Sequence, residues 1–81
     1  MLSWVGSPAS GRAVEVLVKA RRRAAVSQRE LAAKMGMAPS VIAKIEMGER
    51  RIDVVELITL ADSLHMDPKQ LFAEIVDATR S

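Results

Sequence analysis

The 81-residue sequence has no cysteine and no tyrosine, and it contains a single tryptophan, phenylalanine and histidine. Without cysteine the chain forms neither disulfides nor thiolate metal sites, and one histidine cannot complete a metal cage. No metal or cofactor is therefore expected. Because a domain this small has a thin hydrophobic core, self-association is the stabilising device that remains.

Groups suited to catalysis are also scarce. The sequence lacks a glycine-rich phosphate-binding loop, and its one histidine, His65, lies between Leu64 and Met66. At the end of a predicted helix, a histidine is favoured by the helix dipole and is not placed as a general base. We therefore do not expect an enzyme.

Hydrophobic residues make up 49% of the chain, which is typical of a folded domain. The longest stretch without a charge, residues 1–11, is too short to cross a bilayer, and no basic residue precedes its apolar part. Membrane insertion and secretion are not expected, so we expect a cytoplasmic protein.

The net charge of +2 hides two halves of opposite sign. Residues 12–51 hold ten basic and four acidic residues, which gives +6, and residues 52–81 hold two basic and six acidic residues, which gives −4. A basic half suits a polyanion such as nucleic acid, and an acidic, apolar half suits contact with protein.

Strands are disfavoured because aromatic residues are nearly absent and no alternation of period two persists. The sequence therefore predicts an all-α fold. Glycine, proline and serine in residues 1–11 predict a flexible N-terminal arm, with the folded domain over residues 12–81.

Cap and stop signals divide this domain into five helices. Capping boxes are expected at Ser27 with Glu30 and at Asp53 with Glu56, and glycine ends helices where a left-handed residue is needed. Proline suits the first helical turn. The first helix is expected over residues 12–24, the second to Met35, the third over 39–47, the fourth to Leu64 and the fifth from Asp67.

The spacing of the second and third helices closely resembles the phage repressor and Cro family of helix-turn-helix proteins, the xenobiotic-response-element type, over residues 12–76. The resemblance rests on Ser27-Gln28, Leu31-Ala32, Met35-Gly36-Met37, Ile42, Ile45-Glu46, Gly48, Leu57, Leu60-Ala61, Leu64 and Asp67. It implies a compact five-helix, lambda-repressor-like DNA-binding domain whose recognition helix, about residues 39–47, enters the major groove. Ala25 and His65 depart from the pattern, because the family usually has glycine there.

The resemblance also implies a DNA contact surface on these two helices and the following loop. Its members are Ser27, Gln28, Arg29, Ala38, Pro39, Ser40, Ala43, Lys44, Arg50 and Arg51. The family uses the glutamine at Gln28 to bind phosphate. If Arg29, Lys44, Arg50 and Arg51 each neutralise one phosphate, a dimer carries eight such cations, and the salt slope is about −7. Solvated loop charges are the alternative for Arg50 and Arg51.

The predicted recognition helix is poor in side chains that recognise bases. It lacks the glutamine, asparagine or arginine that makes bidentate contacts with adenine or guanine. Lys44 suits either guanine or phosphate, and the methyl groups of Ala38, Val41 or Ala43 suit the thymine methyl. Specificity is expected to depend on DNA shape, water and dimer spacing.

Arg21 and Glu46 match a family pair that forms a partly buried ion pair between the first and third helices.

A dimer surface is expected on the C-terminal half. Its candidates are Val55, Ile58, Phe72, Ile75 and Val76, although Leu71 and Phe72 are also expected to face the monomer core. Alternatively, the fifth helix covers the core together with Trp4.

These features predict a sequence-specific transcriptional regulator that binds double-stranded DNA as a homodimer, of bacterial or phage type. A chain this small is expected to leave no room for an effector pocket. A restriction-modification controller is one form of such a regulator. The alternative from another class is a protein-interaction module, of the antitoxin or inhibitor type, with an unknown protein partner.

Overall fold

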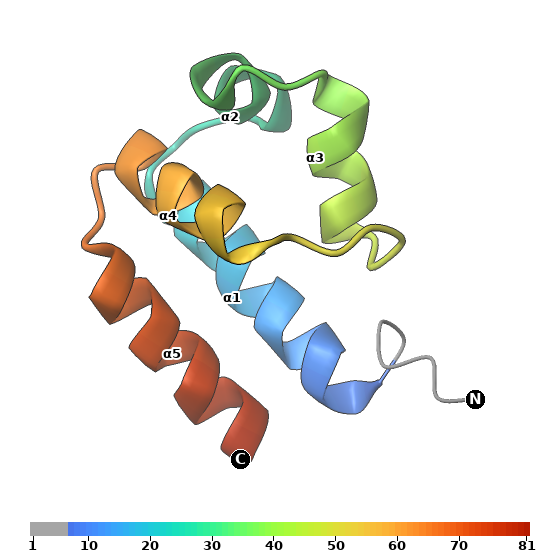
Figure 1. Cartoon of the computed structure of the whole chain (residues 1–81), viewed down its shortest axis with the longest axis vertical. Coiled ribbons are helices and arrows are strands. Elements are labelled where there is room, and N and C mark those ends of the chain that lie inside the picture. Colours follow the sequence, from blue (N-terminus) through green and yellow to red (C-terminus); the bar gives the residue numbers. More distant parts are fainter. Residues whose placement is uncertain (1–6) are drawn as a thin grey trace.

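The computed structural model describes residues 7–81, which form five helices joined by short turns (Figure 1). The helices are α1 (Pro8–Arg23), α2 (Gln28–Met35), α3 (Pro39–Glu46), α4 (Val54–Ser63) and α5 (Pro68–Arg80). The predicted all-α fold with five helices is confirmed over this range. None of these helices is both long and apolar enough to cross a membrane.

The first helix begins four residues earlier than predicted. Pro8 occupies its first turn, and the Ser7 hydroxyl accepts a hydrogen bond of 3.1 Å from the amide of Ser10. A serine cap followed by proline is a helix start signal, so the flexible arm predicted over residues 1–11 is wrong for Pro8–Gly11. Trp4, which was considered as a cover for the core, lies outside the described residues.

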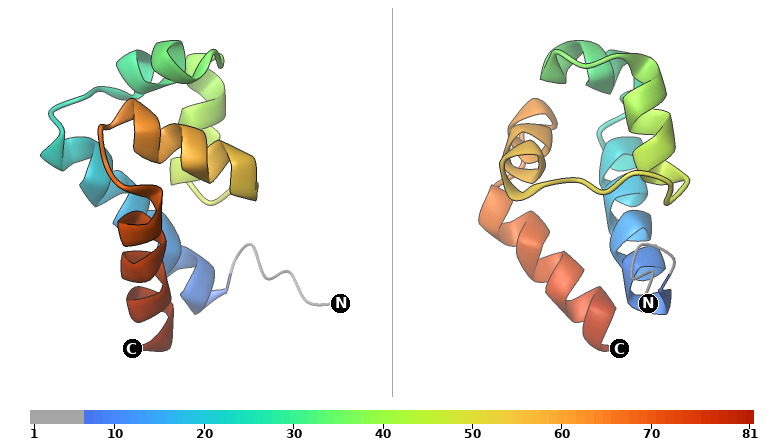
Figure 2. Two further views of the ribbon diagram at one scale, coloured as in Figure 1. Left: turned by 60° about the vertical axis from the view of Figure 1, so that its left-hand side comes forward. Right: turned by 45° about the vertical axis from the view of Figure 1, so that its right-hand side comes forward.

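Helices α1 and α5 pack side by side and run in opposite directions (Figures 1 and 2). Arg12, near the start of α1, donates from Nε to the carbonyl of Ala78 at 2.8 Å and from Nη2 to that of Thr79 at 3.3 Å. A charged donor thereby satisfies carbonyl groups in the last turn of α5, where the helix dipole favours a cation.

The core is built from one buried stripe on each helix. Its buried residues are Leu17, Ala20, Leu31, Ala32, Ile42, Ile45, Leu60, Ala61, Leu64 and Leu71. Ala32 is completely buried where α2 meets α3, so a small side chain lets the two helices approach closely. The core therefore fixes the angle between α2 and α3 and the face of α3 that points outward.

Both predicted capping boxes are present. Ser27 and Glu30 exchange hydrogen bonds of 2.9 and 3.0 Å at the start of α2, and Asp53 and Glu56 do the same at the start of α4. The start of α5 differs, because Asp67 accepts from the amide of Lys69 and not from that of Gln70.

Within residues 7–81, four turn residues have a left-handed backbone: Ala25, Gly36, Gly48 and His65. Gly36 and Gly48 were predicted to end helices, and their φ angles are +69° and +76°. Ala25 and His65 adopt the same conformation, with φ of 56° and 57°. This conformation is sterically strained for residues with a Cβ atom, because Cβ then lies too close to the following carbonyl oxygen. The two departures from the family pattern thus preserve the shape of the turns.

Replacing Ala25 with glycine should stabilise the protein, because glycine removes the steric strain of the left-handed backbone. Allowing for the greater entropy of glycine in the unfolded chain, we expect a gain of about 0.5–1 kcal/mol, or roughly 2–8 °C in Tm. Ala24→Gly is the matched control, because Ala24 has right-handed angles and glycine should lower Tm there. Thermal unfolding of both variants tests the explanation, and equal shifts would contradict it.

Candidate nucleic-acid interface

A hydrogen-bond network joins the three helices around the turn. Arg21 of α1 donates from Nε to Glu46 Oε2 at 2.7 Å and from Nη2 to Glu46 Oε1 at 3.0 Å. It also donates from Nη1 to the carbonyl of Val26 at 2.9 Å. The structure thus forms the ion pair expected between Arg21 and Glu46, and the same guanidinium fixes the loop between α1 and α2.

The pair is largely withdrawn from solvent, since the side chains of Arg21 and Glu46 are 11% and 9% exposed. Burial raises the pKa of Glu46, but hydrogen bonds from Arg21 and Gln28 and the nearby positive charges outweigh it, so this pKa lies below 4.5. The ionised pair therefore stabilises the fold above the unfolded pKa, and this contribution is lost as the pH falls through the folded pKa.

Gln28 belongs to this network, which its predicted role did not include. Its Nε2 donates to Glu46 Oε1 at 2.8 Å. An amide nitrogen carries two hydrogens, so the second remains chemically suited to phosphate. The contact with Glu46 fixes the side-chain nitrogen at the start of α2.

Carboxylate charge also lies at the start of α2. The capping box places Glu30 there, and hydrogen bonds with Ser27 hold its pKa below the ordinary value. Because a carboxylate repels phosphate, the helix end itself is less favourable to DNA than the sequence indicated. Lys34, one turn further along α2, is the nearby cation that favours the ionised form of Glu30, and Arg29 is exposed on the first turn.

Helix α3 lies on the side of the molecule away from α5 (Figures 1 and 2). Ile42 and Ile45 are buried, and Val41 packs partly against the core. The opposite side, which we call the reading face, consists of Ser40, Ala43, Lys44 and Met47. Val41 is therefore turned away from it, whereas Ala38 and Pro39 are exposed at the start of the helix.

The two arginines of the loop after α3, Arg50 and Arg51, differ in their surroundings. Arg50 donates to both carboxylate oxygens of Glu56 at 2.9 and 2.8 Å, and it also bonds the carbonyl of Arg51. This bidentate pair lowers the pKa of Glu56 and raises that of Arg50. Arg50 thus stabilises the loop internally, while Arg51 is exposed.

A third charged pair lies outside this region. Arg23 Nη2 lies 3.1 Å from Glu74 Oε1, and both side chains are partly exposed. Among the cations of the predicted contact set, Arg29 and Lys44 belong to exposed residues and form no ion pair with a carboxylate of residues 7–81. Arg51 is also exposed.

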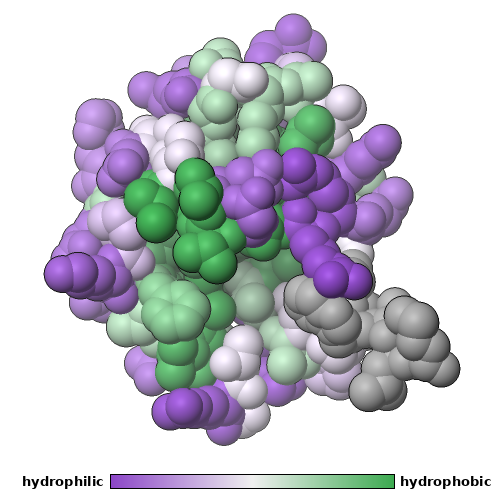
Figure 3. Space-filling model, in the orientation of Figure 1, coloured by the Kyte–Doolittle hydropathy of each residue, from purple (hydrophilic) through white to green (hydrophobic). Residues whose placement is uncertain are grey.

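Hydrophobic side chains gather over α4 and the middle of α5 (Figure 3). We call the exposed residues Val54, Val55, Ile58 and Phe72 the α4–α5 face. Phe72 is 56% exposed, so its predicted place in the core is wrong. Helical geometry explains this, because the core holds Leu71, one residue away. Of the other predicted members, Ile75 packs against the core and Val76 is half-buried.

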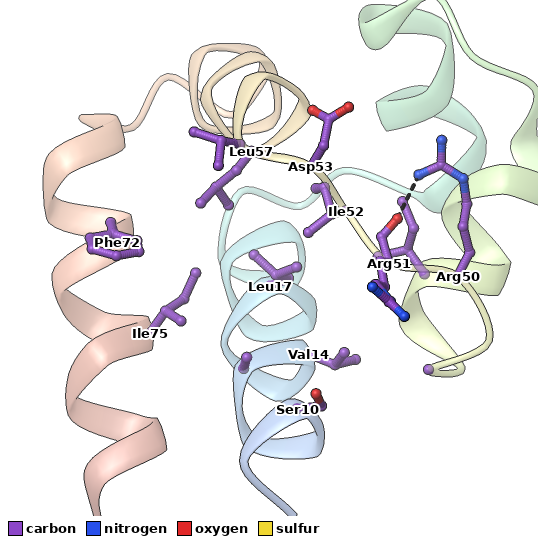
Figure 4. A pocket seen from close by; sticks show the side chains of 14 residues that line it. Ser10, Val14, Leu17, Arg50, Arg51, Ile52, Asp53, Leu57, Phe72 and Ile75 are labelled. Carbon is purple, nitrogen blue, oxygen red and sulfur yellow. Dashed lines mark hydrogen bonds between the residues drawn. The ribbon is translucent and has the colours of Figure 1, made fainter. Parts of the chain in front are cut away.

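An apolar groove of about 340 Å³ runs between α1, α5 and the segment that leads into α4. Figure 4 shows Ile75 directed from α5 toward α1, with Ile52 on the opposite wall. Val54 and Phe72 line the groove as well, so it is continuous with the α4–α5 face. The expectation that the chain leaves no room for a pocket is therefore wrong.

The α2–turn–α3 unit, with α3 supported from behind by the core, defines a helix-turn-helix domain of the DNA-binding class. The Helix-turn-helix family model matches residues 17–71. A solved structure described as an XRE-family like protein from Pseudomonas syringae pv. tomato str. DC3000 is 32% identical, with a TM-score of 0.78 over 85% of this chain and 84% of that chain. No curated protein matches the chain. The chain belongs to the XRE family of helix-turn-helix proteins, which confirms the resemblance seen in the sequence.

Arg21→Ala should destabilise the protein strongly, because it leaves the Glu46 carboxylate largely buried without its cation. We expect a loss of about 3–5 kcal/mol in the free energy of unfolding. Arg23→Ala is the matched control, because the exposed pair with Glu74 contributes only about 0–1 kcal/mol. Urea unfolding monitored by circular dichroism measures both, and similar losses in the two variants would refute the structural role given to Arg21.

Proposed function

We propose that the protein is a sequence-specific transcriptional regulator that binds double-stranded DNA as a homodimer, with α3 in the major groove. The observation that carries the proposal is the outward-facing reading face of α3, with Lys44 on it and the exposed Arg29 and Arg51 on neighbouring segments. An α-helix fits the major groove, and cations beside it bind the phosphate backbone. Ser27 and Gln28 at the start of α2, and Ala38, Pro39 and Ser40 at the start of α3, complete the proposed contact surface.

Binding as a dimer follows from the small size of one reading face, which spans only part of an operator. Two-fold dimers read two half-sites about one helical turn apart. The α4–α5 face supports this proposal, because Val54, Val55, Ile58 and Phe72 expose apolar surface that a second copy can cover.

The salt dependence of binding tests the proposed contact with phosphates. With Arg50 engaged by Glu56, we count the exposed cations Arg29 and Lys44, two per subunit or four per dimer. We expect the logarithm of the binding constant to fall with the logarithm of salt concentration with a slope of about −4. Gel shifts with DNA from upstream of the protein's own gene, over a series of salt concentrations, measure this slope.

Two variants show, in the same assay, which cations contribute to the salt slope. Lys44→Gln removes two phosphate-facing charges per dimer and should make the slope shallower by about 2. Arg50→Gln should leave the slope nearly unchanged, because Arg50 is already paired with Glu56. A slope shallower than about −2 for the unmodified protein contradicts this arrangement. Absence of binding even at low salt favours the protein-interaction alternative.

Phe72→Asp should separate the proposed dimer, because a carboxylate then replaces apolar surface in both copies. Burying a phenylalanine contributes about 1.5–3 kcal/mol per copy, so the dimer dissociation constant should rise about 100-fold or more. Ala33→Asp is the control, because Ala33 is exposed on α2, outside the α4–α5 face. Sedimentation equilibrium measures both variants, and an unchanged dimer in Phe72→Asp places the interface elsewhere.

A further inference from the structure

We infer that Met47 is a specificity residue that, together with Ala43, recognises the 5-methyl group of thymine in the major groove. The inference rests on the proposed function and names the chemical group that this site reads. Met47 was not among the residues that the sequence indicated as DNA contacts. The structure places it beside the DNA-facing residues of α3 and leaves it exposed.

Met47 continues the reading face past the last residue of α3. Its backbone angles, φ −85° and ψ −3°, are right-handed, and its amide donates to the carbonyl of Ala43 at 3.0 Å. The side chain therefore follows the helical spacing and lies on the same face as Ser40, Ala43 and Lys44, which are seven, four and three residues before it. That face is an arc of the helix surface directed away from Ile42 and Ile45.

The exposure of Met47 has no explanation in the packing of the monomer. Met35, Met37 and Met66 pack against the core, whereas Met47 is 63% exposed. The other large apolar side chains exposed within residues 7–81 all belong to the α4–α5 face, so Met47 alone adjoins α3. An apolar side chain at this place can pack against an apolar group in the major groove when α3 binds DNA as proposed.

The thymine methyl is the apolar group that base pairs present in the major groove. Of the four side chains on the reading face, those of Ala43 and Met47 offer only apolar or weakly polar contacts, and only Ser40 and Lys44 are strong hydrogen-bond donors. In the proposed function, Lys44 binds the phosphate backbone and does not select a base. The face as a whole thus suits half-sites that present thymine methyl groups to Ala43 and Met47.

Replacing thymine with deoxyuridine tests this inference directly, because it removes the methyl group and keeps every hydrogen-bonding group of the base. Duplexes are first selected from a random pool by the full-length protein, and each thymine of the selected site is then replaced in turn. Burial of one methyl group changes affinity about fourfold. Symmetric replacement in both half-sites should therefore weaken binding about 15-fold at the contacted positions.

Met47→Ala and Lys44→Gln complete the experiment as a matched pair of exposed substitutions. Met47→Ala should abolish the penalty of deoxyuridine at one position per half-site, and the Tm should stay unchanged because the side chain is exposed. Lys44→Gln should weaken binding to every duplex and retain the deoxyuridine penalty. Deoxyuridine effects within twofold at every position, or penalties that persist at every position in Met47→Ala, would overturn the inference. If no duplex is enriched, the proposed function fails and the inference fails with it.

Discussion

The guanidinium of Arg21 makes the set of hydrogen bonds on which the position of α3 depends. It reaches from α1 to Glu46 at the end of α3 and to the loop before α2, and Gln28 binds the same carboxylate. Three helices are thereby joined at one largely buried charge. The core sets the packing angle of α3, and the largely buried pair also ties the end of α3 to α1. The same network therefore serves both stability and the placement of the reading face.

Ion pairs neutralise part of the positive charge in the first half of the chain. Arg21, Arg23 and Arg50 are engaged by carboxylates, and the last two draw their partners from the acidic second half of the chain. The opposite charges of the halves thus stabilise contacts between α1 and α5 and between the loop and α4. A simple count of basic residues consequently overstates the charge that faces a polyanion, because paired arginines add little to it.

Much of the fold follows from local signals in the sequence. The capping boxes at Ser27 and Asp53 and the left-handed Gly36 are properties of a few neighbouring residues, and for that reason they were predictable. The start of α1 was missed although Ser7 and Pro8 carry the same signal as later helix starts, because glycine and serine nearby suggested an arm. The Gln28–Glu46 and Arg50–Glu56 contacts depend on side-chain placement across turns, and helical spacing alone does not contain that information.

The outward side of α3 carries few polar groups. Buried isoleucines on one side orient the helix, and the other side carries serine, alanine, lysine and methionine. Long polar side chains gain specificity through directed hydrogen bonds, but they lose conformational entropy when they are fixed. Ser40 and Ala43 lose little entropy on contact because they are short, whereas Lys44 and Met47 lose more. In the proposed complex, discrimination depends on DNA shape and on methyl groups, and affinity depends on the surrounding cations and on a second subunit.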